Sequence, residues 1–190
     1  MTTEAIKLPP SSEEAEVCVL GSILIDNDAV LAVSEFLRAD HFYNSNYSKI
    51  YEAMMKLYEE RSPIDIVTVS EKLKELKVLK NIGGKGFLTR LASEVPTSAN
   101  VESYGHIIKS LSAKRELISA AGRISEKAFD PGLPADQLLD IAEQEIFSLS
   151  QKHLKSIPTS LKEVLTASFD RLDELQKMGN GLRGVPSGFK

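Results

Sequence analysis

Two long amphipathic stretches, roughly residues 100–129 and 135–152, are separated by the short sequence DPGLP. Its Pro131, Gly132 and Pro134 cannot continue a helix and favour a tight reversal of the chain. The apolar residues on both sides recur with the period of a helix. The sequence therefore predicts an αα-hairpin of two long antiparallel helices.

The first arm of this hairpin has two apolar faces. One partner helix cannot cover both, so we expect a second partner, either the preceding part of the chain or another subunit. One face carries Tyr104, Ile108, Leu111, Ile118 and Phe129, and its neighbour carries Leu117, Ala121, Ile124 and Ala128.

The first hundred residues predict several shorter helices. Ser11 with Glu14 gives a capping box for a buried first helix, and Gly83-Gly84 gives a turn before a helix that ends at Val95-Pro96. Between them, helical periodicity covers residues 29–37, 47–60 and 66–76, with a strand at 64–69 as the alternative for the last. Aromatic residues make up only 6% of the chain, which also favours an all-α fold over a sandwich or barrel.

A last amphipathic helix is expected at residues 160–178. Ser160 and Glu163 form a capping box, and Gly179 stands at the expected C-terminal position. Pro-containing loops separate this helix from its surroundings, so its apolar stripe should dock on a surface that the rest of the chain does not obviously supply. The stripe consists of Leu161, Val164, Leu165, Phe169, Leu172 and Leu175.

No catalytic, cofactor or metal site is predicted. The G-x-G-x-x-G spacing at Gly179, Gly181 and Gly184 follows a helix instead of a strand, so we interpret it as accidental. The three histidines are far apart, and the single cysteine, Cys18, is expected to be a small buried residue. The net charge of -4, without a run of basic residues, argues against strong DNA binding by this segment itself.

Several stretches together resemble one family, the DnaB-type replicative DNA helicases of bacteria and plastids. The opening LPPSSEEAEVCVLGSILID resembles the family's P-x-S-x-E-A-E-x-x-V-L-G-S-x-L-x-D. DHFYNSNYSKIYEAMMKLYEERSPIDIVTVSEKL, then FLTRLASEVPTSANVESYGHIIK, and finally GVPSGF continue the match in order and spacing. Ser12-Glu13-Glu14 departs from the family at its middle position, which is often apolar there.

The resemblance implies three regions: a helical N-terminal collar at 8–100, a subunit-pairing hairpin at 101–152, and a linker at 153–190 containing the helix 160–178. The RecA-like motor of the family would follow Lys190, and this chain would be non-catalytic by itself. ATP and Mg²⁺ are expected for the full-length family only.

The implied partners are further copies, in a hexamer built as a trimer of dimers, and primase, with a helicase loader as a further possibility. Single-stranded DNA would be bound only through the motor, and no membrane is involved. The expected location is the cytoplasm at the replication fork, with the plastid as an alternative. Docking candidates for primase are Glu14, Phe87, Ile118 and Ile124, and hairpin candidates for subunit pairing are Leu117, Ala121, Ala128, Leu139, Ile146 and Phe147.

Two other classes of function stay open at this point. One is a motorless regulatory protein that joins helicase rings and interferes with them. The other is an independent enzyme, which the lack of catalytic motifs disfavours.

Overall fold

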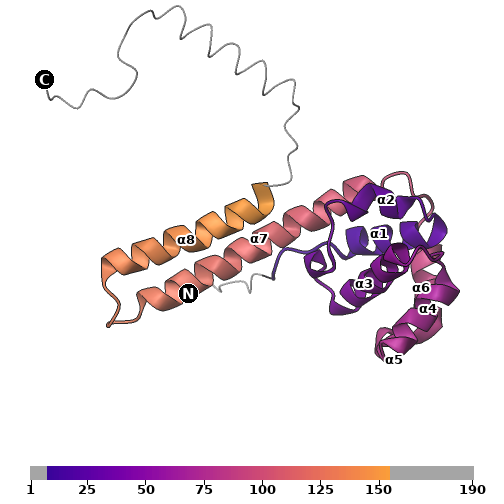
Figure 1. Cartoon of the computed structure of the whole chain (residues 1–190), viewed down its shortest axis with the longest axis horizontal. Coiled ribbons are helices and arrows are strands. Elements are labelled where there is room, and N and C mark those ends of the chain that lie inside the picture. The colour runs from indigo at the N-terminus through magenta and orange to yellow at the C-terminus, as the bar shows by residue number, and fades with distance from the viewer. Residues whose placement is uncertain (1–7, 155–190) are drawn as a thin grey trace, which may run out of the picture. The chain divides into compact units, whose positions relative to one another are not determined.

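The computed structural model describes residues 8–154, and all regular structure in this range is helical (Figure 1). The chain divides into two compact units, Met1–His153 and Leu154–Lys190. The predicted all-α fold is confirmed for the first unit. The expected helix at 160–178 lies outside the described residues.

Helix α1 (Glu13–Ile25) lies at the centre of the first unit and packs against α6, α7 and α3. It begins after Ser12, whose hydroxyl accepts a hydrogen bond from the Ala15 N–H over 3.3 Å. The N-cap is therefore Ser12, whereas the sequence predicted Ser11, one residue earlier. Val19, Leu20 and Ile23 are fully buried, as expected for a central helix.

Three elements follow: the short helix α2 (Ala29–Ser34), the 3₁₀ turn η1 (Ala39–His41) and the longer helix α3 (Ser45–Glu59). Tyr47, Tyr51 and Met54 recur on one face of α3 and are buried in the core, which agrees with the helical periodicity predicted at 47–60. The Tyr51 hydroxyl donates to the Leu37 carbonyl over 3.3 Å, so its polar end is satisfied. The sequence reading missed η1, which is only one turn long.

Helix α4 (Ile66–Glu75) replaces the strand considered at 64–69. One Asp65 carboxylate oxygen accepts from the N–H groups of Val67 and Thr68, over 2.7 and 2.8 Å, and this cap commits the β-branched residues after it to a helix. Helices α5 (Leu79–Ile82) and α6 (Gly84–Glu94) meet at Gly83-Gly84, where φ is +104° and +73°. These angles favour glycine and explain the predicted turn.

Helices α7 (Val101–Ala128) and α8 (Ala135–Leu154) form the predicted hairpin, and α8 returns beside α7 (Figure 1). In the turn, the Gly132 N–H donates to the Asp130 carboxylate over 2.9 Å. The first part of α7 packs against α1 and α2, which buries Ile108 and Ser112. Across residues 8–154, no helix is long and apolar enough to cross a membrane.

Candidate functional site

Glu14 and Phe87, two of the four docking candidates, lie on helices that pack against each other. Glu14 is exposed in the first turn of α1, and Phe87 is half-buried on α6. The Phe87 ring stacks on Tyr47 with centroids 6.0 Å apart, and the Tyr47 hydroxyl donates to Glu13 Oε1 over 3.0 Å. Tyr47 thus connects Phe87 to the residue next to Glu14.

The electrostatics of this region are mixed. The Arg90 guanidinium lies 4.9 Å from the centroid of the Phe87 ring, a cation–π contact at the edge of the surface. Burial, followed by the hydrogen bond to Glu13, raises the pKa of Tyr47 to about 12, so its hydroxyl stays a donor. An aromatic ring beside a guanidinium is a combination that is enriched where proteins dock.

Arg115 on α7 holds the start of the chain in place. Its Nη1 donates to the Pro10 carbonyl over 2.8 Å, and its Nη2 donates to the His41 carbonyl over 2.6 Å. The same guanidinium lies 5.5 Å from the centroid of the Tyr43 ring. One side chain therefore ties three segments together, and Glu14 is positioned only a few residues after the first of them.

Glu16, also in the first turn of α1, is only 2% exposed. Its Oε1 accepts from the Tyr43 N–H over 2.6 Å and its Oε2 accepts from the Asn44 N–H over 3.2 Å. Burial raises the pKa of this carboxyl, against the lowering effect of the two backbone N–H groups and Arg115. The carboxylate therefore fixes the chain entering α3, which carries Tyr47.

Ile118 and Ile124, the other two docking candidates, lie further along α7. Ile118 is 58% exposed, whereas Ile124 is half-buried. In the part of the chain that the structure describes, neither takes part in the ring and hydrogen-bond contacts that join Phe87 to α1. The four candidates are thus spread over three helices.

The six residues predicted to pair subunits are all exposed, and we call them the hairpin surface. Phe147 is 62% and Leu139 67% exposed, although large apolar side chains usually avoid water. Phe129, near the turn, is 85% exposed and extends this apolar area. The hairpin surface consists of Leu117, Ala121, Ala128, Leu139, Ile146 and Phe147.

Polar contacts hold the two arms of the hairpin together. Arg123 Nη2 donates to Glu145 Oε2 over 2.7 Å, and Lys152 Nζ donates to Glu116 Oε1 over 2.9 Å. The hydrogen bond from Arg123 lowers the pKa of Glu145. A cavity of about 350 Å³ lies between these pairs, lined by Ala120 and Leu149 among others. Charged pairs therefore join the arms around this cavity, while the residues of the hairpin surface stay exposed.

Two further expectations concern the linker helix and a metal site. The linker-helix residues from Leu161 to Leu175 lie outside the described range. Within residues 8–154, no three His, Cys, Asp or Glu side chains are arranged to hold a metal ion.

Sequence reasoning missed Arg115 and Glu16 as organising residues. In the sequence, Glu16 looks like an ordinary acidic residue in the first turn of a helix, where the helix dipole favours carboxylates. Its burial depends on backbone groups 27 and 28 residues away along the chain. The partners of Arg115 are still more distant in sequence, so no local pattern marks them.

Comparison with known proteins gives one consistent family. Residues 8–110 match the model of the "DnaB-like helicase N terminal domain". The replicative DNA helicase DnaC of Bacillus subtilis is 36% identical over 96% of this chain, and this chain spans 40% of its length. The chain therefore corresponds to less than half of that relative.

Solved structures agree with the family match. The N-terminal domain of DnaB helicase from Mycobacterium tuberculosis is similar with a TM-score of 0.70 and 34% identity, covering 75% of this chain and 99% of that one. The N-terminal domain of DnaB helicase from Helicobacter pylori, described together with its interactions with primase, gives a TM-score of 0.54 at 30% identity. That similarity covers 61% of this chain and 90% of the Helicobacter pylori chain.

Proposed function

This chain belongs to the DnaB-like helicase N-terminal domain family, and from that membership we propose that it is the assembly and primase-docking region of a replicative DNA helicase. Its work is to pair with further copies and to present a surface to primase, without chemistry of its own. The observation that carries the proposal is the exposed hairpin surface, because apolar side chains such as Phe147 and Leu139 are stabilised by leaving water.

We propose a separate role for each region of the chain. Residues 8–100 form the collar with Glu14 and Phe87, and residues 101–152 pair subunits through the hairpin surface. Residues 153–190 would link this region to a motor in the whole protein. We propose a hexamer as a trimer of dimers, a cytoplasmic location at the fork, and ATP and Mg²⁺ as cofactors of the motor alone. The bacterial relatives give no support to a plastid location.

Primase docking is supported by the contacts that join Phe87 to Arg90 and, through Tyr47, to Glu13, and by the Helicobacter pylori domain, whose interactions with primase are described. Docking candidates on three helices, with Ile118 on the hairpin, suit a partner that touches both collar and hairpin. The affinity for such a partner would depend on how the collar and the hairpin are placed relative to each other. A helicase loader could share part of the same surface.

The test is a calorimetric titration of the chain with the helicase-binding domain of the primase from the same genome. We expect saturable binding, and Glu14→Lys and Ile118→Ser should each weaken it by about tenfold, since each removes an exposed contact. Glu35→Lys is the matched charge control, because Glu35 is exposed and lies outside the docking candidates. A folded, oligomeric sample that does not bind would refute the docking proposal, as would equal losses with the Glu35 control.

A further inference from the structure

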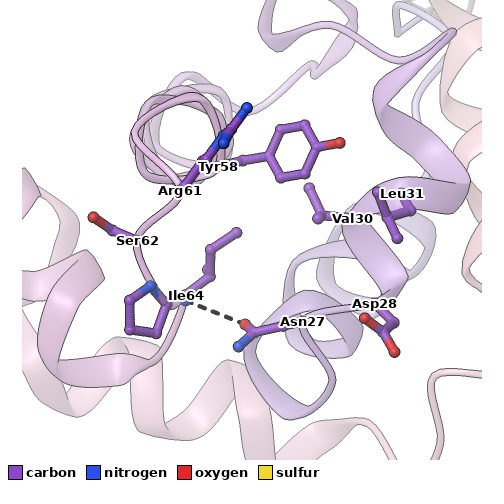
Figure 2. Close-up of a pocket in the computed structure, with 9 residues that line it drawn as sticks. Asn27, Asp28, Val30, Leu31, Tyr58, Arg61, Ser62 and Ile64 are labelled. Atoms are coloured by element: carbon purple, nitrogen blue, oxygen red, sulfur yellow. Dashed lines mark hydrogen bonds between the residues drawn. The ribbon is translucent and has the colours of Figure 1, made fainter.

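A cavity of about 330 Å³ lies between the start of α2 and the turn that joins α3 to α4 (Figure 2). Its size falls at the lower end of the range for ligand pockets, roughly 300–1,000 Å³. Val30 and Ile64, both buried, and half-buried Tyr58 contribute apolar surface to it, and Leu31 on α2 is 54% exposed beside them. We call it the α2 pocket. It shares no residue with the docking candidates or the hairpin surface.

A long-range hydrogen bond fixes the two sides of the α2 pocket relative to each other. The Ile64 N–H donates to Asn27 Oδ1 over 3.2 Å, and Figure 2 shows this bond between two of the residues that line the cavity. Asn27 precedes α2, whereas Ile64 precedes α4, so the bond joins segments 37 residues apart. The cavity is therefore bounded by a defined contact between separate elements.

Arg61 in this pocket has a strained backbone. Its φ is +55°, in the left-handed region that a residue with a side chain rarely adopts. The bond from the Ser62 N–H to the Leu57 carbonyl, over 2.9 Å, closes a Schellman turn after α3, where glycine is the usual residue. Lys77 ends α4 in the same way, with φ +60°, but does not line the pocket. Arginine at position 61 keeps a guanidinium beside the cavity where glycine would give an easier turn.

The charges around the α2 pocket are opposite and unpaired. In the view of Figure 2, Arg61 lies at one end of the cavity and Asp28 at the other. Among the described residues neither side chain forms an ion pair, and Asp28 makes no capping bond to α2. Both side chains can therefore form ion pairs with a partner that places an acidic group near Arg61 and a basic group near Asp28.

We propose that the α2 pocket binds a segment of another protein in which a leucine-like side chain is flanked by a basic and an acidic residue. The apolar side chain would pack between Leu31 and Ile64. The partner's carboxylate would pair with Arg61, and its basic residue with Asp28. The apolar lining disfavours a small polar ligand, and the two unpaired charges favour a segment with both signs over a purely apolar one.

The probe is the capped hexapeptide Lys-Ala-Leu-Leu-Ala-Glu, titrated into the full ¹⁵N-labelled chain and followed by amide chemical shifts. We expect saturable shifts concentrated at residues 27–31 and 58–64. Replacing both leucines of the peptide by serine should abolish them, because the apolar anchor is lost. Shifts scattered over the chain, or none at millimolar peptide, would overturn the proposal.

Charge reversal makes the test specific. Arg61→Glu should weaken binding of the peptide by about tenfold, and a peptide ending in Lys in place of Glu should recover that loss on the Arg61→Glu variant. Lys77→Glu is the matched control, since Lys77 has the same left-handed backbone outside the pocket, and it should leave binding unchanged. Both residues are exposed, and circular dichroism verifies that each variant is folded.

Two results would contradict the charge assignment. The first is equal weakening by Lys77→Glu, which would reduce the effect to general electrostatics. The second is a concentration-dependent shift of the same amides without peptide, which would place a second copy of this chain in the pocket.

Discussion

Glu16 shows how one buried carboxylate can organise a surface that it does not join. Its two oxygens satisfy the N–H groups of Tyr43 and Asn44, so the chain reaches α3 in a fixed position. Removing the carboxylate would leave two part-buried N–H groups without their acceptor, and each such group that water does not reach costs about 1–3 kcal/mol. The sequence shows an acidic residue in the first turn of a helix, but it could not indicate the partners, because they lie 27 and 28 residues away along the chain.

Gly21 has a comparable role in packing. A Cβ built on Gly21 would overlap Val95 Cγ2 and the Leu91 carbonyl oxygen, so α1 and α6 approach each other through the missing side chain. Gly21→Ala should therefore lower the free energy of unfolding by about 1–3 kcal/mol, the usual cost of overpacking. Urea unfolding measures this difference.

Gly122 on α7 is the control for this substitution. A Cβ there would meet nothing within 4 Å. Because alanine is the better helix former, Gly122→Ala should raise the free energy of unfolding by up to about 1 kcal/mol. Equal effects of the two substitutions would show that the close approach of α1 and α6 is not what excludes a side chain at Gly21.

At the scale of elements, strong local signals were read correctly and weak ones were missed. The periodicity of α3 and the DPGLP turn between α7 and α8 depend only on residues that are close together in the sequence, and both predictions are confirmed. The elements η1 and α5 span three and four residues, too few to show a helical period. At α1 the sequence predicted Ser11 as the cap, and only the hydrogen bond between Ser12 and the Ala15 N–H identifies the neighbouring serine instead.

The cap of α4 gives a prediction with a pH dependence. Asp65→Ala should lower the free energy of unfolding by about 1 kcal/mol at pH 7, because the N–H groups of Val67 and Thr68 lose their acceptor. Backbone hydrogen bonds, first that from Thr68, lower the pKa of Asp65 below its ordinary 3.8. A lowered pKa means that this stabilisation is complete above the unfolded-state value and is lost as the pH falls through the folded-state value.

Asp28→Ala is the control for the Asp65 cap. Asp28 precedes α2 but makes no side-chain capping bond, so its replacement should change stability by only a few tenths of a kcal/mol. Thermal or urea unfolding of both variants at pH 7 and at about pH 3 tests the prediction. A difference for Asp65→Ala that does not shrink at the lower pH would contradict the role of the ionised cap.

At the scale of the whole molecule, the apolar surface of the hairpin could be inferred from sequence, but its arrangement could not. Two apolar faces on residues 100–129 required two partners, and the structure leaves Leu117 and Ile118 about half exposed or more. The ion pairs that join the arms, such as Arg123 with Glu145, link residues 22 positions apart and had no signal in the periodicity. Ala120 and Leu149 lie between the arms, whereas Leu139 and Phe147 stay exposed, and only the three-dimensional arrangement distinguishes these two groups.

Self-association through the hairpin surface gives the last prediction. The double variant Leu139→Glu/Phe147→Glu should weaken dimerisation by roughly a hundredfold or more, because burying each large side chain contributes about 1.5–3 kcal/mol. Charge repulsion between copies adds to this loss. Sedimentation velocity over a range of concentrations measures the dissociation constant. Val67→Glu is the control, since Val67 is 56% exposed but lies on α4, away from the hairpin. If the double variant associated as the parent does, or if Val67→Glu weakened association equally, the apolar face of the hairpin would not be where copies of this chain meet.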